Sequence, residues 1–329
     1  MVNPAAALVS DLFAREIEKK PTRDGFGTGT VDAGKKDPNV VVLCADLKES
    51  TRAEWFEDAF PDRFVEMGVA EQNLATVAAG MAAIGKVPFI ASYAAFSPGR
   101  NYEQIRTTIV LNKKHVIVCG MHAGVSVGPD GATHQMLEDI GLMRMLPGMQ
   151  VFVPGDAEEA RKAVLAAAGH DGPSYIRFGR TATPVFTTPE TPFEIGKALT
   201  LWDHDKPKVA ILSTGTLSYE ALLAARTLAS DGIESTVLHI PCVKPLDTEA
   251  VVRAARKAGR VLTVEEHQVM GGFGSAVAEC LGEAYPVPMK RIGVQDAFGQ
   301  SGTPEELMEH YGLSAVHIAA AARTLIGVS

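Results

Sequence analysis

Glu71 is the first residue in the chain whose type and position suggest chemistry. It stands in Arg63-Phe-Val-Glu-Met-Gly-Val-Ala-Glu-Gln-Asn-Leu74, where a short apolar run ends in a glycine and a helix of small residues follows. A carboxylate at the start of a helix is stabilised by the free amide groups of the first turn. Many such residues are only helix caps. From this stretch alone, Glu71 can be either a helix cap or a reactive carboxylate.

The loop from His122 to Gln135 holds a second group of polar side chains, namely His122, Asp130 and His134, among several glycines. Glycine lets a backbone approach a ligand closely. A metal site is one reading, but the spacing matches no standard zinc pattern. Polar residues that bond the backbone of a tight turn are another. A pocket for a polar substrate fits best, because histidines donate hydrogen bonds and move protons near neutral pH.

Two aromatic residues and three arginines complete the candidates. Tyr93 and Phe96 lie three residues apart just before an expected helix, where such pairs more often belong to a core than to a cofactor slot. Arg23, Arg100 and Arg180 each lie at or just past the end of an expected element. A single arginine in such a place is usually solvated, but several that converge would bind a phosphate.

Continuous apolar runs predict the strands that must position these residues. In the first half they are 40–44, 64–65, 87–92, 115–120, 150–153 and 174–178, and in the second half 209–213, 235–240, 260–264 and 290–294. Because these runs do not alternate with polar residues, we expect sheets that are covered on both faces. Helical stretches separate the strands, which predicts parallel α/β sheets. Function in such sheets concentrates at the carboxyl ends of the strands.

A segment rich in proline and threonine, residues 181–192, separates the two halves and is expected to be an extended linker. We therefore predict two α/β domains, residues 1–190 and 191–329, each a mostly parallel sheet with helices on both faces. Expected helices are 5–19, 21–36, one from 71, 101–112, one from 157, 218–230, 247–258, 273–283 and two after 303.

Composition excludes several function classes. The 329 residues carry 31 Lys and Arg against 39 Asp and Glu, a net charge of −8, with the basic residues scattered. This argues against a nucleic-acid or anionic-membrane partner. The four cysteines are far apart in sequence, which favours buried free thiols. Because no signal-peptide core is visible and no apolar run approaches the about 20 residues of a membrane span, we expect a cytoplasmic protein.

Four motifs, taken in order, resemble the pyrimidine-binding domain of transketolase. They are Gly68-Val-Ala-Glu71-Gln-Asn, Tyr93-Ala-Ala-Phe96, the loop His122 to Gln135, and Ile176-Arg-Phe-Gly-Arg180. The second half resembles the transketolase C-terminal domain through Val243-Lys-Pro-Leu-Asp247, Thr263-Val-Glu-Glu-His267 and Gly271-Gly-Phe-Gly274. Close helix packing is the favoured role of that last motif, ahead of an anion site. The resemblance covers nearly the whole chain, and the ordered set is far more specific than any one motif.

The Gly-Asp-Gly motif, through which this family anchors thiamine diphosphate by magnesium, does not occur in the sequence. The chain therefore resembles the C-terminal subunit of a transketolase that is split into two polypeptides. The resemblance implies that an N-terminal subunit supplies the diphosphate and Mg²⁺ site, that this chain supplies no metal ligand, and that the two chains form a heterotetramer.

The resemblance also implies roles for the candidate residues. Glu71 would bind N1′ of the cofactor's aminopyrimidine, with Phe96 and Tyr93 packed against the ring; Tyr93 stands where the family usually has phenylalanine. His122 and Asp130 align with residues that bond the substrate hydroxyls. The positions that align with phosphate-binding residues for sugar phosphates are His134, Arg180, Arg23 and Ser50.

The implied activity is transfer of a two-carbon ketol unit from a ketose phosphate to an aldose, as in the pentose phosphate reactions. A β subunit of a 2-oxoacid dehydrogenase is the alternative, although the His122 loop and Arg180 suit a polyol phosphate better than a short oxoacid. An enzyme like deoxyxylulose-phosphate synthase is disfavoured, because that family keeps its diphosphate domain in the same chain. A non-catalytic relative conflicts with the presence of Glu71, Asp130 and both histidines.

Overall fold

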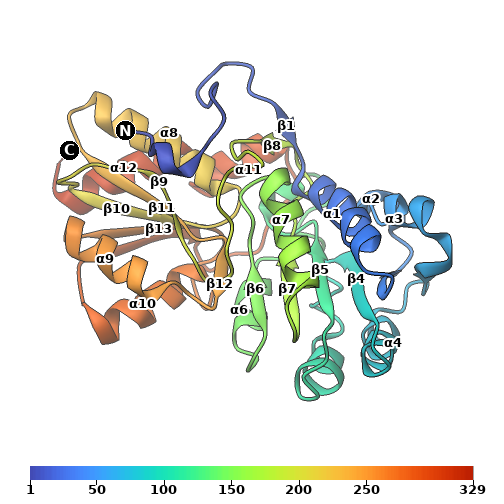
Figure 1. Cartoon of the computed structure of the whole chain (residues 1–329). Coiled ribbons are helices and arrows are strands. Elements are labelled where there is room, and N and C mark those ends of the chain that lie inside the picture. Colours follow the sequence, from blue (N-terminus) through green and yellow to red (C-terminus); the bar gives the residue numbers. More distant parts are fainter. Residues whose placement is uncertain (329) are drawn as a thin grey trace.

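Two sheets lie side by side in residues 1–328, the part of the chain that the computed structural model describes (Figure 1). The first has the spatial order β12 (Cys242–Lys244), β6 (Gln150–Phe152), β7 (Ser174–Arg177), β5 (Ile117–Met121), β4 (Val87–Tyr93), β2 (Val40–Cys44) and β3 (Phe64–Glu66). The second has the order β14 (Met289–Val294), β13 (Val261–Gln268), β10 (Val209–Ser213), β11 (Ser235–His239) and β9 (Leu199–Trp202). Only the edge strands β12 and β9 run antiparallel to their neighbours in these two sheets. The predicted α/β class with two mostly parallel sheets is confirmed.

Helices cover both faces of the first sheet, because its strands are apolar on both sides. Val40 and Val42 of β2 pack with Phe26 of α1 on one face. Val41 and Leu43 belong to the cluster on the other face. The helices of this half are α1 (Thr22–Lys36), α2 (Lys48–Thr51), α3 (Glu54–Ala59), α4 (Glu71–Ala83), α5 (Tyr102–Gln104) continued by a π-helix (Ile105–Val110), α6 (Asp139–Arg144) and α7 (Ala157–Ala168).

The second sheet repeats this arrangement. Along β10, Val209 and Ile211 pack in one apolar cluster, and Ala210 and Leu212 in another. Buried residues of α8 and α12 belong to the first of these clusters, and those of α9 and α10 to the second. The helices of this half are α8 (Leu217–Ser230), α9 (Thr248–Ala258), α10 (Phe273–Ala284), α11 (Pro304–His310) and α12 (Ala315–Ile326).

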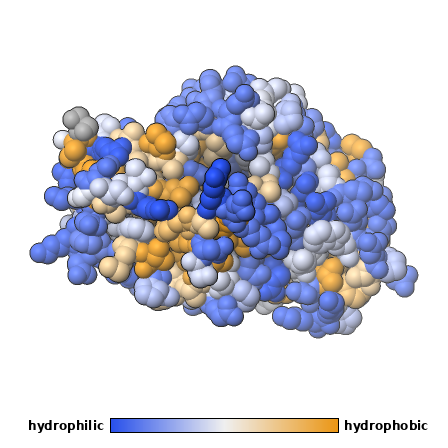
Figure 2. Space-filling view, turned by 90° about the horizontal axis from the view of Figure 1, so that it is seen from above, coloured by the Kyte–Doolittle hydropathy of each residue, from blue (hydrophilic) through white to orange (hydrophobic). Residues whose placement is uncertain are grey.

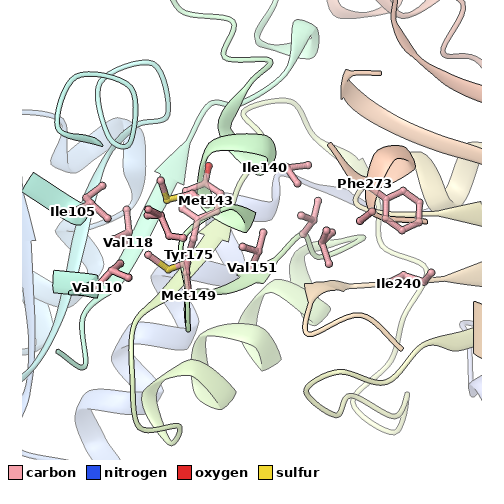
Figure 3. Packing of buried hydrophobic residues seen from close by; sticks show 14 of the residues in the cluster. Ile105, Val110, Val118, Ile140, Met143, Met149, Val151, Tyr175, Ile240 and Phe273 are labelled. Carbon is pink, nitrogen blue, oxygen red and sulfur yellow. The ribbon is translucent and has the colours of Figure 1, made fainter. Parts of the chain in front are cut away.

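One apolar cluster runs from the first sheet into the second half of the chain (Figure 3). Val118 and Tyr175 of the first sheet belong to it together with Ile240 and Phe273 of the second half. Because burial of apolar surface stabilises by about 25 cal/mol per Å², this shared core holds the two halves together.

Each half also lends a segment to the other. Strand β12 lies beyond residue 191 in the chain, yet it pairs with β6 at the edge of the first sheet. At the amino terminus, Val2 forms a β-bridge with Trp202, and the Asn3 amide donates to the Leu201 carbonyl of the second sheet.

The predicted helix over residues 5–19 is wrong. A single 3₁₀ turn (Pro4–Ala6) is followed by Ala7 at a left-handed φ of 48° and then by turns. Leu12 and Ile17 are buried in the apolar cluster of the second sheet. The apolar residues that suggested a helix therefore belong to an irregular segment, which packs on the second domain.

The segment 181–192 is extended, as predicted, and it is packed against the protein. Its short strand β8 (Thr183–Pro184) pairs with β1 (Lys19–Lys20). Phe186 is fully buried, and the Thr187 hydroxyl donates to Asp156.

Within residues 1–328 no helix is long and apolar enough to cross a membrane. The face shown in Figure 2 is mostly hydrophilic, and hydrophobic residues gather in its left half, on the side of the second domain.

Candidate active site

Most of the predicted site residues meet at the carboxyl edge of the first sheet. Tyr93 is the last residue of β4, and His122 directly follows β5. Ser50 lies in α2 after β2, and Arg180 lies three residues after β7. Arg23 joins them from the first turn of α1. Parallel strands thus bring together residues from five separate parts of the sequence.

Glu71 is 1% exposed and is the first residue of α4. Its carboxylate accepts hydrogen bonds from Arg100 Nη1 and, at 3.4 Å, from Ser92 Oγ. The side chain makes no bond to the first-turn amides of its own helix among the described residues, and the N-cap position is Ala70. Asn101 Nδ2 donates to the Glu71 carbonyl at 2.9 Å, which fixes the backbone there. Glu71 is therefore directed into the site and does not act as a side-chain cap.

Three rings stack on one another, and Arg100, which binds Glu71, lies over one of them. Tyr93 lies 4.1 Å from His122 and 6.0 Å from Phe96, measured between ring centroids, at interplanar angles of 22° and 23°. The guanidinium carbon of Arg100 lies 4.7 Å from the Phe96 centroid. One planar cation thus covers Phe96 and binds Glu71 at the same time.

His122 has a defined tautomer in this arrangement. Arg23 Nη1 lies 2.9 Å from His122 Nε2 and is always a donor, so Nε2 accepts. The 3.2 Å contact between that nitrogen and the Ser50 carbonyl would need Nε2 to donate. The neutral ring therefore carries its proton on Nδ1, which is buried and has no partner within residues 1–328. That N–H is a buried donor without an acceptor among the described residues.

Burial, with the nearby charges of Arg23 and Arg180, lowers the pKa of His122 from 6.5 to about 3. Unfolding restores the ordinary pKa, so the unfolded chain binds one more proton than the folded chain between these values. Stability contributed by neutral His122 is therefore lost as the pH falls below 6.5.

The free energy of unfolding of His122→Gln, minus that of the native chain, should be about 2 kcal/mol larger at pH 5 than at pH 7. The reason is that the variant lacks the histidine whose protonation favours unfolding. Urea unfolding of both chains at the two pH values measures this difference. The control is His310→Gln, which changes an exposed histidine. Its difference from the native chain in free energy of unfolding should be the same at pH 7 and pH 5. Equal pH dependence of His122→Gln and the native chain would contradict the assigned neutral state.

The substrate-binding candidates form a polar rim around the rings. Arg180 Nη1 donates to Asp130 Oδ1 at 3.3 Å and to the Val127 carbonyl at 3.0 Å. His134 lies edge-on to Phe96 with a centroid distance of 5.5 Å. Ser50 Oγ accepts a hydrogen bond from the Tyr93 hydroxyl at 3.0 Å. One arginine, one carboxylate, one hydroxyl and the His134 imidazole thus lie around the stacked rings.

Several residues that shape this site cannot be assigned that role from the sequence. Arg100 stands out there only as an arginine at an element end, because its partner Glu71 is 29 residues away. Ser92 and Asn101 support Glu71 through buried contacts. Glu266 of the second domain accepts from the Ser126 amide inside the His122 loop. Two adjacent glutamates directly after the run Val261-Leu-Thr-Val264 are the available signal for that last contact.

No group of three or more His, Cys, Asp or Glu residues stands where it could hold a metal ion in the described part of the chain. The histidines and aspartate of the loop contact arginine, threonine and aromatic side chains.

Models of two protein domains match this sequence. Residues 18–185 match the transketolase pyrimidine-binding domain, and residues 196–318 match the transketolase C-terminal domain. The chain belongs to the transketolase family. Both domains that the sequence motifs suggested are present.

Relatives in this family include subunits of split transketolases. The chain is 41% identical to 6-deoxy-6-sulfo-D-fructose transketolase subunit SqwH of Clostridium sp. (strain MSTE9), over 94% of this chain and 96% of that one. It is 36% identical to an apulose-4-phosphate transketolase subunit of Phocaeicola vulgatus, over 88% and 93%. A solved structure described as a split gene transketolase, inactive beta4 tetramer, is 45% identical with a TM-score of 0.87, over 94% of this chain and 99% of that chain.

Proposed function

We propose that this chain is the pyrimidine-binding and substrate-binding subunit of a thiamine diphosphate-dependent transketolase. It would act with an N-terminal subunit that holds the diphosphate and Mg²⁺, and the pair would move a two-carbon ketol unit from an anionic ketose to an aldose. The observation that carries this proposal is the buried carboxylate of Glu71, joined through Arg100 to the stacked Phe96 and Tyr93 rings.

The residues around Glu71 suit the aminopyrimidine of that cofactor. A planar group with N–H donors, the Arg100 guanidinium, already lies on the Phe96 ring and bonds the carboxylate. An aminopyrimidine is also planar and presents a ring nitrogen in its own plane. Thiamine diphosphate, when bound, supplies the thiazolium carbon to which the two-carbon unit is transferred. Glu71 would hold the pyrimidine ring by a charge-assisted hydrogen bond in a site from which water is excluded.

The other side chains would hold the substrate. The free Nδ1–H of His122 would donate to a hydroxyl or carbonyl oxygen beside the reacting carbon. Asp130 would accept from a substrate hydroxyl, and Arg180, Arg23 and His134 would bind the terminal anion, with Ser50 donating to it. Guanidinium groups bind phosphate and sulfonate oxygens alike. The names of two relatives include one sulfonated and one phosphorylated sugar, which supports an anion-binding end in the substrate site.

Exposed apolar residues at both ends of α4 support a docking partner next to Glu71. Val69, just before the helix, is 71% exposed, and Ile84, just after it, is 79% exposed. Val69 is only two residues from Glu71, so a partner that covers it would bury apolar surface next to the carboxylate. A partner on this surface would lie close to the pyrimidine-binding residues.

Reconstitution tests the proposal. The chain alone should be inactive, and it should become active with the partner encoded by a neighbouring reading frame that carries Gly-Asp-Gly, when thiamine diphosphate and Mg²⁺ are added. Ketol transfer is measured with ketose phosphates and with a sulfonated ketose as donors. Turnover of pyruvate with a lipoyl acceptor, without turnover of either ketose, would instead support a 2-oxoacid dehydrogenase subunit.

A further inference from the structure

The second domain reaches into the loop that carries the substrate-binding candidates. Glu266 lies on β13, is 6% exposed, and its Oε1 accepts from the Ser126 amide at 2.7 Å. Ser126 belongs to the 3₁₀ turn Val125–Val127 between His122 and Asp130. One carboxylate of the C-terminal domain thus fixes the backbone midway between two residues proposed to bind the substrate.

The fit between Glu266 and this loop is too close for a side chain on Gly124. A Cβ built there would lie 2.2 Å from Glu266 Oε1, and Gly124 also has a φ of 93°, which favours glycine. The loop backbone therefore passes close to the carboxylate at Gly124. This contact explains one glycine of the loop without any reference to substrate.

Further hydrogen bonds tie the same turn on its other sides. Thr181 Oγ1 donates to the Ser126 carbonyl at 2.6 Å, and Arg180 Nη1 donates to the Val127 carbonyl at 3.0 Å. The buried amide of Gln135 donates to the Val125 carbonyl at 3.2 Å and to the Gln300 carbonyl of the second domain at 3.0 Å. Each of these bonds satisfies a carbonyl, whereas Glu266 is the acceptor for the Ser126 amide.

We propose that Glu266 is a positioning residue for ketose binding, and that the C-terminal domain thereby sets the geometry of the substrate loop. This inference rests on the proposed function, because the loop residues matter only if they bind the sugar. Loss of the Ser126 bond would let the turn shift, and Asp130 and His122 would meet the substrate in a less favourable arrangement. The chemistry at Glu71, which lies on a different strand end, would change little.

Kinetics of the reconstituted complex test this with a matched pair of variants. Glu266→Asp shortens the side chain and withdraws the acceptor, so the KM for the ketose donor should rise about 10-fold, the equivalent of 1.4 kcal/mol, with kcat within about 2-fold. Glu266→Gln keeps an acceptor oxygen at full length and should restore the KM. Glu265→Asp changes the neighbouring buried glutamate, whose oxygens accept from the Phe273 and Gly274 amides and not from the loop. Its KM should stay at the native value.

Amide exchange of Ser126, followed by mass spectrometry, gives a readout that does not need activity. Exchange should become faster in Glu266→Asp and not in Glu265→Asp. Equal changes in KM for the two aspartate variants, or an unchanged Ser126 exchange rate in Glu266→Asp, would overturn the proposal. If Glu266→Asp does not fold, Ser126→Pro deletes the amide donor and carries the same expectation for KM. Absence of ketol transfer by the native complex would refute the proposed function, and the exchange rates would still decide whether Glu266 holds the loop.

Discussion

Replacement of Glu71 by glutamine should lower kcat of the reconstituted complex by at least about 100-fold. The amide keeps the size of the side chain and one acceptor oxygen, but it removes the negative charge that would hold the cofactor's pyrimidine in its reactive form. Loss of one preorganised electrostatic partner in a site that excludes water typically costs a factor of about 10² to 10³ in kcat. Steady-state ketol transfer at saturating cofactor measures the effect.

The Glu71→Gln variant should fold normally, because a buried carboxylate is replaced by a neutral group of equal shape. Circular dichroism and binding to the partner subunit check this point. Glu103→Gln, which changes an exposed carboxylate on the nearby helix α5, is the matched control and should retain native kcat. Activity of Glu71→Gln within about 3-fold of the native complex would remove Glu71 from the proposed catalytic role, since electrostatic partners of this kind are worth far more.

Replacement of Asp139 by alanine should destabilise the folded chain by about 3–5 kcal/mol, because it leaves Arg177 as an uncompensated buried charge. Asp139 is fully buried and its Oδ2 accepts from Arg177 Nε at 2.8 Å and from the Tyr175 hydroxyl at 2.7 Å. Arg177 also donates to the Glu266 carbonyl at 2.8 Å. The free energy of unfolding from urea titration measures the effect.

An exposed ion pair offers the control for Asp139. Asp231 pairs with Arg323 on the surface, where both side chains remain partly solvated, so Asp231→Ala should cost less than about 1 kcal/mol. Similar losses from the two variants would mean that Arg177 finds another partner or water after the change. The expected contrast follows from burial, since the two pairs are chemically alike.

Most strands of the parallel sheets can be predicted because they stand out in the sequence as continuous apolar runs. Val40 to Cys44 is a continuous apolar run, and both faces of that strand are in fact covered. Strand β12 cannot be found this way, since its partner β6 lies about ninety positions earlier, in the other half of the chain. The irregular segment over residues 5–19 resembles a helix in sequence because apolar residues covering another domain can be spaced like those of a helix face.

Residues of the candidate site are predictable where they belong to a motif and unpredictable where they depend on distant contacts. Glu71, His122 and Asp130 stand in ordered motifs. The orientation of Glu71 toward Arg100, and not toward its own helix amides, requires a fold that brings positions 29 residues apart together. The proton on His122 Nδ1 likewise follows from Arg23, which is 99 residues away. Pairings of this kind have no local pattern in the sequence.

The exchange of segments between the two halves bears on how the substrate reaches the site. Domains joined by a simple linker tend to rotate about it, unless their interface is large and apolar. Here an edge strand from one half is built into the other half's sheet, the amino terminus crosses in the opposite direction, and an apolar core runs through the boundary. A hinge rotation that opened the two halves would break hydrogen bonds at several separate places at once. We therefore expect the two halves to stay together when a substrate binds at the carboxyl edge of the first sheet.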